Sequence, residues 1–80
     1  MNPDDIQKII ESSLADSQAI VTGDGNKFEA TVISSAFDGL SMVKEHQLVY
    51  KLLNEHISSG AIHALTIKSY TPEEWAEQES

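Results

Sequence analysis

A chain of 80 residues without cysteine predicts one small domain, spanning residues 1–80, whose thin core receives no support from disulfides. Its 13 acidic and five basic residues give a formal net charge of −8, which repels phosphate and disfavours tight, sequence-independent binding to nucleic acid. The acidic opening residues precede no long apolar run, so we expect neither a signal peptide nor a transmembrane segment, and we expect a cytoplasmic protein.

The first third of the chain predicts a helix followed by a hairpin. Apolar residues at helical spacing place a helix over Pro3–Ala15, with an acidic first turn that suits the helix dipole. Two β-prone runs follow, Gln18–Thr22 and Lys27–Ser34, and the turn residues Gly23–Asn26 lie between them. The apolar stripe of the helix consists of Ile6, Ile9, Ile10 and Leu14.

A second helix is predicted over Met42–Ser58. Gly39 permits a sharp bend before it, and either Asp38 or Ser41 is placed to cap it. Gly60 ends it, as the C-cap or as the turn residue just beyond. The predicted apolar stripe is Met42, His46, Val49, Leu53 and Ile57, widened by Val43 and Tyr50.

The end of the chain predicts a third strand, Ala61–Ser69, and a last helix from Pro72 to about Gln78. Thr71 is a favourable N-cap, and proline is well tolerated at the first helical position that follows. Glu74 lies three residues after Thr71, which is the spacing of a capping box. The residues that flank the cap as a hydrophobic staple are Tyr70 and Trp75.

The element order α-β-β-α-β-α predicts an α+β fold: a three-stranded sheet with helices packed on one face. A helix connects the second and third strands, and a helical crossover favours a parallel pairing between them.

Enzyme activity is not expected. The chain has no cysteine, no Gly-x-Ser-x-Gly arrangement and no Gly-x-x-x-x-Gly-Lys loop, and its three histidines lack the spacing of zinc ligands. Three lysines, Lys44, Lys51 and Lys68, are diluted by Glu45 and Glu55, so we expect them on a solvated face of mixed charge.

The three histidines differ in their predicted surroundings. His46 lies on the apolar stripe of the long helix, where a structural role with a bond to a backbone carbonyl is favoured. His56 is near the end of that helix, where a partial positive charge suits the dipole. His63 starts the third strand, on the face of Leu65 and Ile67 but at a solvent-accessible end. From spacing alone, both a structural and a ligand role stay open for it.

Several stretches together resemble the BolA family, most closely its short bacterial members. The matching residues are the turn Val21–Gly25, the bend Phe37–Ser41, the helix start Met42–Tyr50, the strand start Ile62–Leu65 and the helix cap Tyr70–Trp75. The family's fold resembles a type II K-homology domain, and the order predicted above is compatible with it.

This resemblance implies a non-enzymatic adaptor that binds a monothiol glutaredoxin and takes part in [2Fe-2S] cluster assembly, trafficking or iron sensing. The implied cluster is shared with glutaredoxin and glutathione, so the isolated protein is expected to hold none; a weak homodimer is compatible with this picture. The C-terminal histidine ligand of the family matches His63, which becomes the candidate cofactor-binding and metal residue. Imidazole nitrogen is a suitable ligand for one iron of such a cluster.

The hairpin loop departs from the family pattern. Members often supply a second ligand, His or Cys, from this loop, and Gly23–Lys27 contains neither. Asp24 offers an oxygen, but a role in the turn is favoured, so the second ligand is left open. The family also includes transcriptional regulators, which makes a nucleic-acid-binding surface around Gly39 and the Lys44/Lys51 helix the alternative hypothesis. The negative charge and the absence of a Gly-x-x-Gly clamp argue against it.

Overall fold

The computed structural model describes residues 1–24 and 27–79. Its elements follow the predicted order: α1 (Pro3–Ser13), β1 (Ser17–Gly23), β2 (Lys27–Ser34), the short 3-10 helix η1 (Ser35–Phe37), α2 (Met42–Ser58), β3 (Ala64–Tyr70) and α3 (Pro72–Glu79). Within these residues, no helix is long and apolar enough to cross a membrane.

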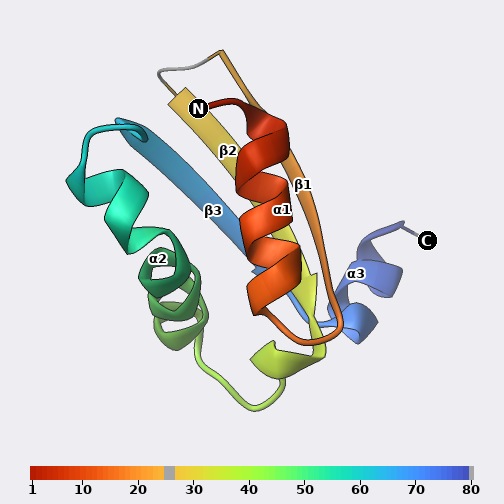
Figure 1. Ribbon diagram of the computed structural model, residues 1–80. Coiled ribbons are helices and arrows are strands. Elements are labelled where there is room, and N and C mark those ends of the chain that lie inside the picture. The colour runs from red at the N-terminus through yellow and green to blue at the C-terminus, as the bar shows by residue number, and fades with distance from the viewer. Residues whose placement is uncertain (25–26, 80) are drawn as a thin grey trace.

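The three strands form one mixed sheet in the order β1-β2-β3, so β1 and β3 are its two edges. β1 pairs antiparallel with β2, and β2 pairs parallel with β3, as the helical crossover predicted. α1 and α2 lie side by side over one face of the sheet, and α3 lies at the end where β3 finishes (Figure 1). The predicted α+β architecture is therefore confirmed.

The core lies between this sheet face and the two long helices. Alternate strand residues point into it, because successive side chains of a strand project to opposite faces. The apolar stripe of α1 packs against these strand residues, as its spacing predicted. The apolar residues that α1, its C-cap and the sheet contribute to this core cluster are Ile6, Ile10, Leu14, Ala19, Phe28, Ala30, Val32 and Ile67.

α1 begins with a capping box that was not predicted from the sequence. The Asn2 side chain accepts a hydrogen bond from the Asp5 N–H (3.0 Å), and the Asp5 carboxylate accepts one from the Asn2 N–H (3.3 Å). The helix ends at Ser13, two residues before the predicted boundary. Asp16 turns the chain with a left-handed backbone (φ 47°), so β1 begins at once.

The buried row of α2 differs from the predicted stripe in the first two turns. Met42 and Val43 expose 70% and 65% of their surface, whereas Glu45 exposes only 7%. The helix meets the core along a row spaced by four residues, Glu45, Val49 and Leu53. The Glu45 carboxylate accepts a hydrogen bond from the Ser69 hydroxyl (2.7 Å), which offsets part of the cost of burying it. The prediction that Glu45 lies on a solvated face is thus wrong.

The capping residues of the last two helices match their predicted roles. Ser41, rather than Asp38, caps α2 by accepting a bond from the Lys44 N–H (3.3 Å). At α3, the Thr71 N–H donates to Glu74 (2.8 Å) and the Glu74 N–H donates to the Thr71 hydroxyl (3.2 Å). The staple is also confirmed, since the rings of Tyr70 and Trp75 lie 5.3 Å apart.

Candidate functional site

His63 lies immediately before β3, in the connection that follows α2. The predicted strand start at Ala61 is wrong, because the chain first folds back over the end of the helix. Gly60, one residue beyond the C-cap, turns with φ 84°, and the Ile62 N–H then donates to the His56 carbonyl (3.1 Å). This wrap buries Ile62 and leaves His63 exposed at the last position before the sheet.

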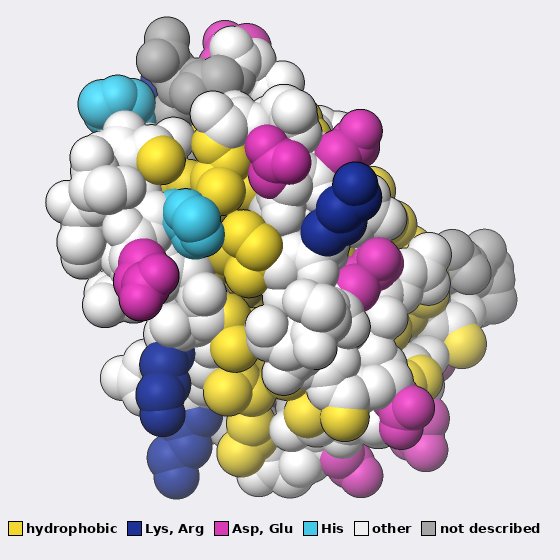
Figure 2. All heavy atoms as spheres, in the orientation of Figure 1, with side chains coloured by type: hydrophobic (Ala, Val, Ile, Leu, Met, Phe, Trp, Pro, Cys, Tyr) yellow, Lys and Arg dark blue, Asp and Glu magenta, His cyan; other side chains and the backbone are white. Residues whose placement is uncertain are grey.

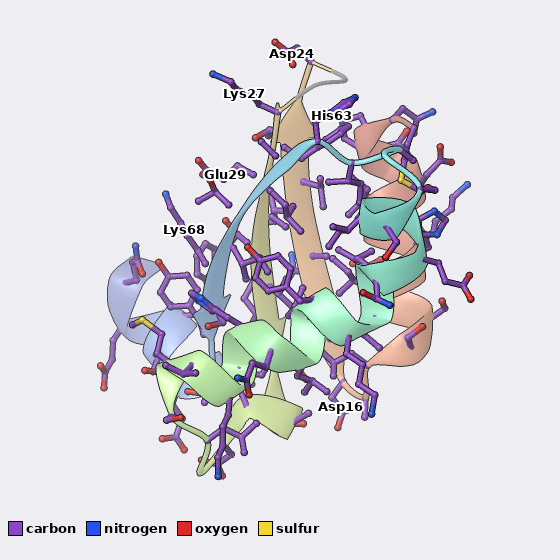
Figure 3. All side chains as sticks on the ribbon, turned by 90° about the vertical axis from the view of Figure 1, so that its left-hand side faces the viewer. Asp16, Asp24, Lys27, Glu29, His63 and Lys68 are labelled. Carbon is purple, nitrogen blue, oxygen red and sulfur yellow. The ribbon has the colours of Figure 1, made fainter. Side chains whose placement is uncertain are left out.

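The same end of the sheet carries the turn between β1 and β2. The register pairs Lys27 with Ala64, the residue that follows His63. Figure 3 shows Asp24, Lys27 and His63 together at this end of the molecule, away from Asp16 at the other end. Residues far apart in the sequence are therefore brought to one exposed corner, the corner to which the family resemblance assigned the ligands.

Asp24 has the turn role that was favoured for it. Its carboxylate accepts a hydrogen bond from the Lys27 N–H (3.2 Å), and its own N–H donates to the Lys27 carbonyl (3.3 Å). These two bonds close the hairpin. The predicted loop also includes Gly25 and Asn26, which lie outside the described residues.

In this corner, the imidazole of His63 is the candidate nitrogen ligand for a metal. His63 is exposed, and no hydrogen bond recorded among residues 1–24 and 27–79 involves its ring, so its lone pair is not committed to the fold. In that same part of the chain, no group of three or more His, Cys, Asp or Glu residues is arranged to hold a metal ion. One imidazole fits a cluster whose remaining ligands come from another molecule, and it does not suffice for a cluster bound by this chain alone.

The other two histidines lie elsewhere and are half-buried. His56 is in the last turn of α2, as predicted. His46 lies in the second turn of that helix, where it lines a pocket against β3. The predicted bond from His46 to a backbone carbonyl is not among the hydrogen bonds of the described residues.

The lysines predicted to share one mixed-charge face are divided by the fold. Lys44 and Lys51 are exposed on α2, whereas Lys68 lies on the sheet face opposite the core, where it pairs with Glu29 at 3.2 Å. Figure 2 shows carboxylates spread over the face formed by α1 and α2, rather than a single basic patch.

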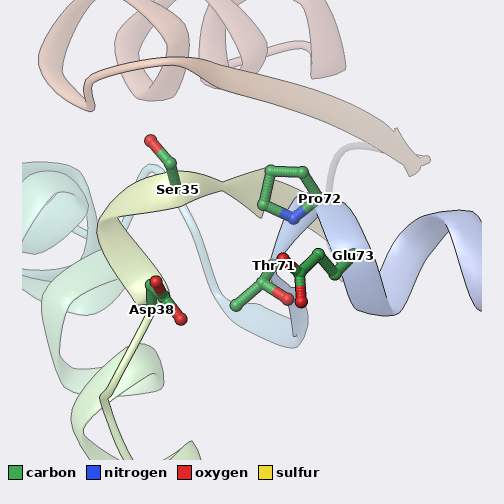
Figure 4. Close-up of a pocket in the computed structure, with 5 residues that line it drawn as sticks. All are labelled: Ser35, Asp38, Thr71, Pro72 and Glu73. Atoms are coloured by element: carbon green, nitrogen blue, oxygen red, sulfur yellow. The ribbon is translucent and has the colours of Figure 1, made fainter.

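A small pocket at the far end of β3 is separate from the His63 corner. It has a volume of about 160 Å³ and is lined by Ser35, Asp38, Thr71, Pro72 and Glu73 (Figure 4). The Thr71 hydroxyl in it already accepts the α3 capping bond. Its polar groups are two carboxylates and two hydroxyls, so it presents no nitrogen or sulfur ligand.

The order of elements, the mixed sheet and the exposed histidine beside the hairpin define a class of small α+β domain with one candidate ligand at a strand end. The family model for BolA-like proteins matches residues 1–74, and the chain belongs to this family. It is 42% identical to the acid stress protein IbaG of Escherichia coli over 76 residues, which are 95% of this chain and 90% of that protein. The resemblance to short bacterial members is thereby confirmed.

Solved structures agree with this assignment. A BolA homologue from Coxiella burnetii superposes with a TM-score of 0.86 at 42% identity, covering 95% of this chain and 97% of that one. The BolA domain of SufE1 from Arabidopsis thaliana gives a TM-score of 0.80 at 32% identity, covering 90% and 93%. The fold of this chain is that of the family.

Proposed function

We propose that this protein is a non-enzymatic, cytoplasmic adaptor that binds a monothiol glutaredoxin and shares a [2Fe-2S] cluster with it, for which His63 supplies a nitrogen ligand. The observation that carries the proposal is the position of His63: exposed, uncommitted to the fold and beside the hairpin turn. Membership in the BolA-like family supports the same role.

The chain's contribution in this role is orientation of an imidazole. The wrap of residues 60–62 over the end of α2 holds the backbone before His63, and the strand that follows is fixed by the parallel ladder with β2. When bound, a [2Fe-2S] cluster supplies redox and iron-sulfur transfer chemistry, and its thiolate ligands have to come from glutaredoxin and glutathione because this chain has no cysteine.

The test is anaerobic reconstitution with a monothiol glutaredoxin, glutathione, iron and sulfide, with and without this protein. The protein alone should hold no cluster. The mixture should show a visible absorption and circular dichroism spectrum different from that of glutaredoxin alone, because a nitrogen replaces a sulfur ligand at one iron.

Three variants make the assignment specific. His63→Ala should abolish the spectral change and shorten the lifetime of the mixed cluster, whereas His63→Cys should keep a cluster with a shifted spectrum, because thiolate also binds iron. His56→Ala, which removes a histidine from the end of α2, should leave the spectrum unchanged. A wild-type spectrum and cluster lifetime for His63→Ala would show that the ligand assignment is wrong.

A further inference from the structure

The outer edge of β3 presents unpaired main-chain groups. The Tyr50 hydroxyl donates to the Leu65 carbonyl (3.2 Å) from outside the sheet, so the main-chain groups of Leu65 face away from β2. Successive residues of a strand direct these groups to alternate sides, so those of Ile67 and Ser69 also face outward. Among the hydrogen bonds of the described residues, none is made by the outward N–H or C=O of Ile67 or Ser69.

A pocket lies directly beside this free stretch. Its volume is about 230 Å³, and its lining residues are Met42 and His46 of α2 together with Ile67, Lys68, Ser69 and Tyr70 of β3. α2 and β3 lie side by side on this side of the molecule in both views (Figures 1 and 3). The pocket is therefore a corner between a helix and an open sheet edge, formed by residues more than 20 positions apart.

Several of the devices that usually protect an edge strand are missing at this stretch, although α2 lies beside it. Edge strands are often blocked by proline, by a bulge or by a charged side chain turned inward. Lys68 projects onto the open sheet face, where it pairs with Glu29 (Figure 3), and the Glu45 carboxylate of α2 is engaged by the Ser69 hydroxyl. Beside the edge, the apolar residue Met42 is 70% exposed.

We propose that an extended segment of a partner protein pairs with the outer edge of β3 at Ile67–Ser69 and places one apolar side chain in the pocket beside Met42 and His46. Unpaired N–H and C=O groups in a row are satisfied by another strand and not by a helix, and strand addition uses side pockets of this kind for specificity. This interaction goes beyond the cluster function, since His63 lies at the opposite end of β3.

Charge decides the composition of the segment. The chain carries −8 overall, and the acidic first turn of α3, Glu73 and Glu74, follows directly after β3. An acidic segment is repelled by this field, so the segment that fits is neutral or basic outside its apolar side chain.

The test uses a synthetic nine-residue peptide of alternating Thr and Val with a central Leu, one Lys at each end, and blocked termini. We expect saturable binding by fluorescence anisotropy, together with slower hydrogen exchange at the Ile67 and Ser69 amides of this protein. N-methylation of the peptide amides on one edge should weaken binding at least tenfold, whereas methylation on the other edge should change it less than twofold, because only one edge pairs.

Two variants of this protein test whether the pocket takes part in peptide binding. Met42→Gln should weaken binding at least fivefold, whereas the matched control Val43→Gln, also exposed but not in the pocket lining, should change it less than twofold. Absence of saturable binding to 1 mM peptide, or equal sensitivity to methylation of both edges, would overturn the proposal. Protection of the same amides by a single-stranded oligonucleotide or by self-association, but not by the peptide, would likewise overturn it.

Discussion

Glu45 is the least expected residue in the core, because its carboxylate is buried between α2 and the sheet with the Ser69 hydroxyl as its donor. Ser69→Ala removes that donor, and a buried acceptor left without its partner costs about 1–3 kcal/mol of unfolding free energy. Urea denaturation should show this loss.

The appropriate control for Glu45 changes both partners. In the double variant Glu45→Met with Ser69→Ala, both polar groups are replaced, and most of the lost stability should return. A double variant that is less stable than Ser69→Ala alone would show that the carboxylate stabilises the fold through contacts other than the serine.

The cap of α3 is a second case in which one hydroxyl carries a measurable free energy. Thr71→Ala removes the acceptor for the Glu74 N–H, and we expect a loss of about 1 kcal/mol, seen as a lower thermal midpoint. Thr71→Ser keeps the acceptor and should melt close to the wild type. An unchanged melting curve for the alanine variant would contradict the capping-box interpretation.

At the scale of elements, the hairpin turn depends on the missing side chain of Gly23. A Cβ built there would meet the Lys27 carbonyl oxygen and lie 2.6 Å from Cδ1 of the buried Phe28. Gly23→Ala should therefore cost well over 1 kcal/mol, because backbone and a core ring both have to move.

Gly60 supplies the comparison for Gly23. It also has a positive φ (84°), but no atom lies within 4 Å of the Cβ that alanine would add. Gly60→Ala should cost only about 1 kcal/mol of backbone strain, again measured by urea denaturation. Equal losses for the two variants would show that strain, and not the close contact, limits Gly23.

Which elements the sequence predicted depends on how local their causes are. The bounds of β2 and α2 and the cap at Thr71 were predicted correctly, because capping residues and periodicity act within a few positions. The start of β3 was not, because it depends on how the chain wraps over the end of α2. The burial of Glu45 depends on Ser69, 24 positions away, and no local pattern signals such a pair.

In the candidate site, too, features with local causes were predicted and features that depend on distant residues were not. His63 was identified through the family resemblance, and its exposure followed from its place at a strand end. Its proximity to the hairpin turn needed the parallel register of β2 and β3. The pocket between α2 and β3 was missed, because the predicted stripe placed Met42 in the core.

For the molecule as a whole, net charge sets what it can bind. With −8 on 80 residues, binding to duplex DNA should be weak at about 150 mM salt and should fade as salt rises. Fluorescence anisotropy with a labelled duplex would measure this. Sub-micromolar, sequence-selective binding at that salt concentration would favour a transcriptional regulator instead, with Lys44 and Lys51 as the first residues to substitute.

The two edge strands of the sheet, β1 and β3, differ in how accessible they are to an additional strand. On β1, the Ala19 N–H already donates to the Glu11 carboxylate of α1 (2.9 Å), which also leaves a negative charge at that margin. A strand that pairs with the middle of β1 would have to displace this bond, so β1 is less open to strand addition than β3. Glu11 thus helps to shield one edge of the sheet from the edge-to-edge pairing that leads to aggregation.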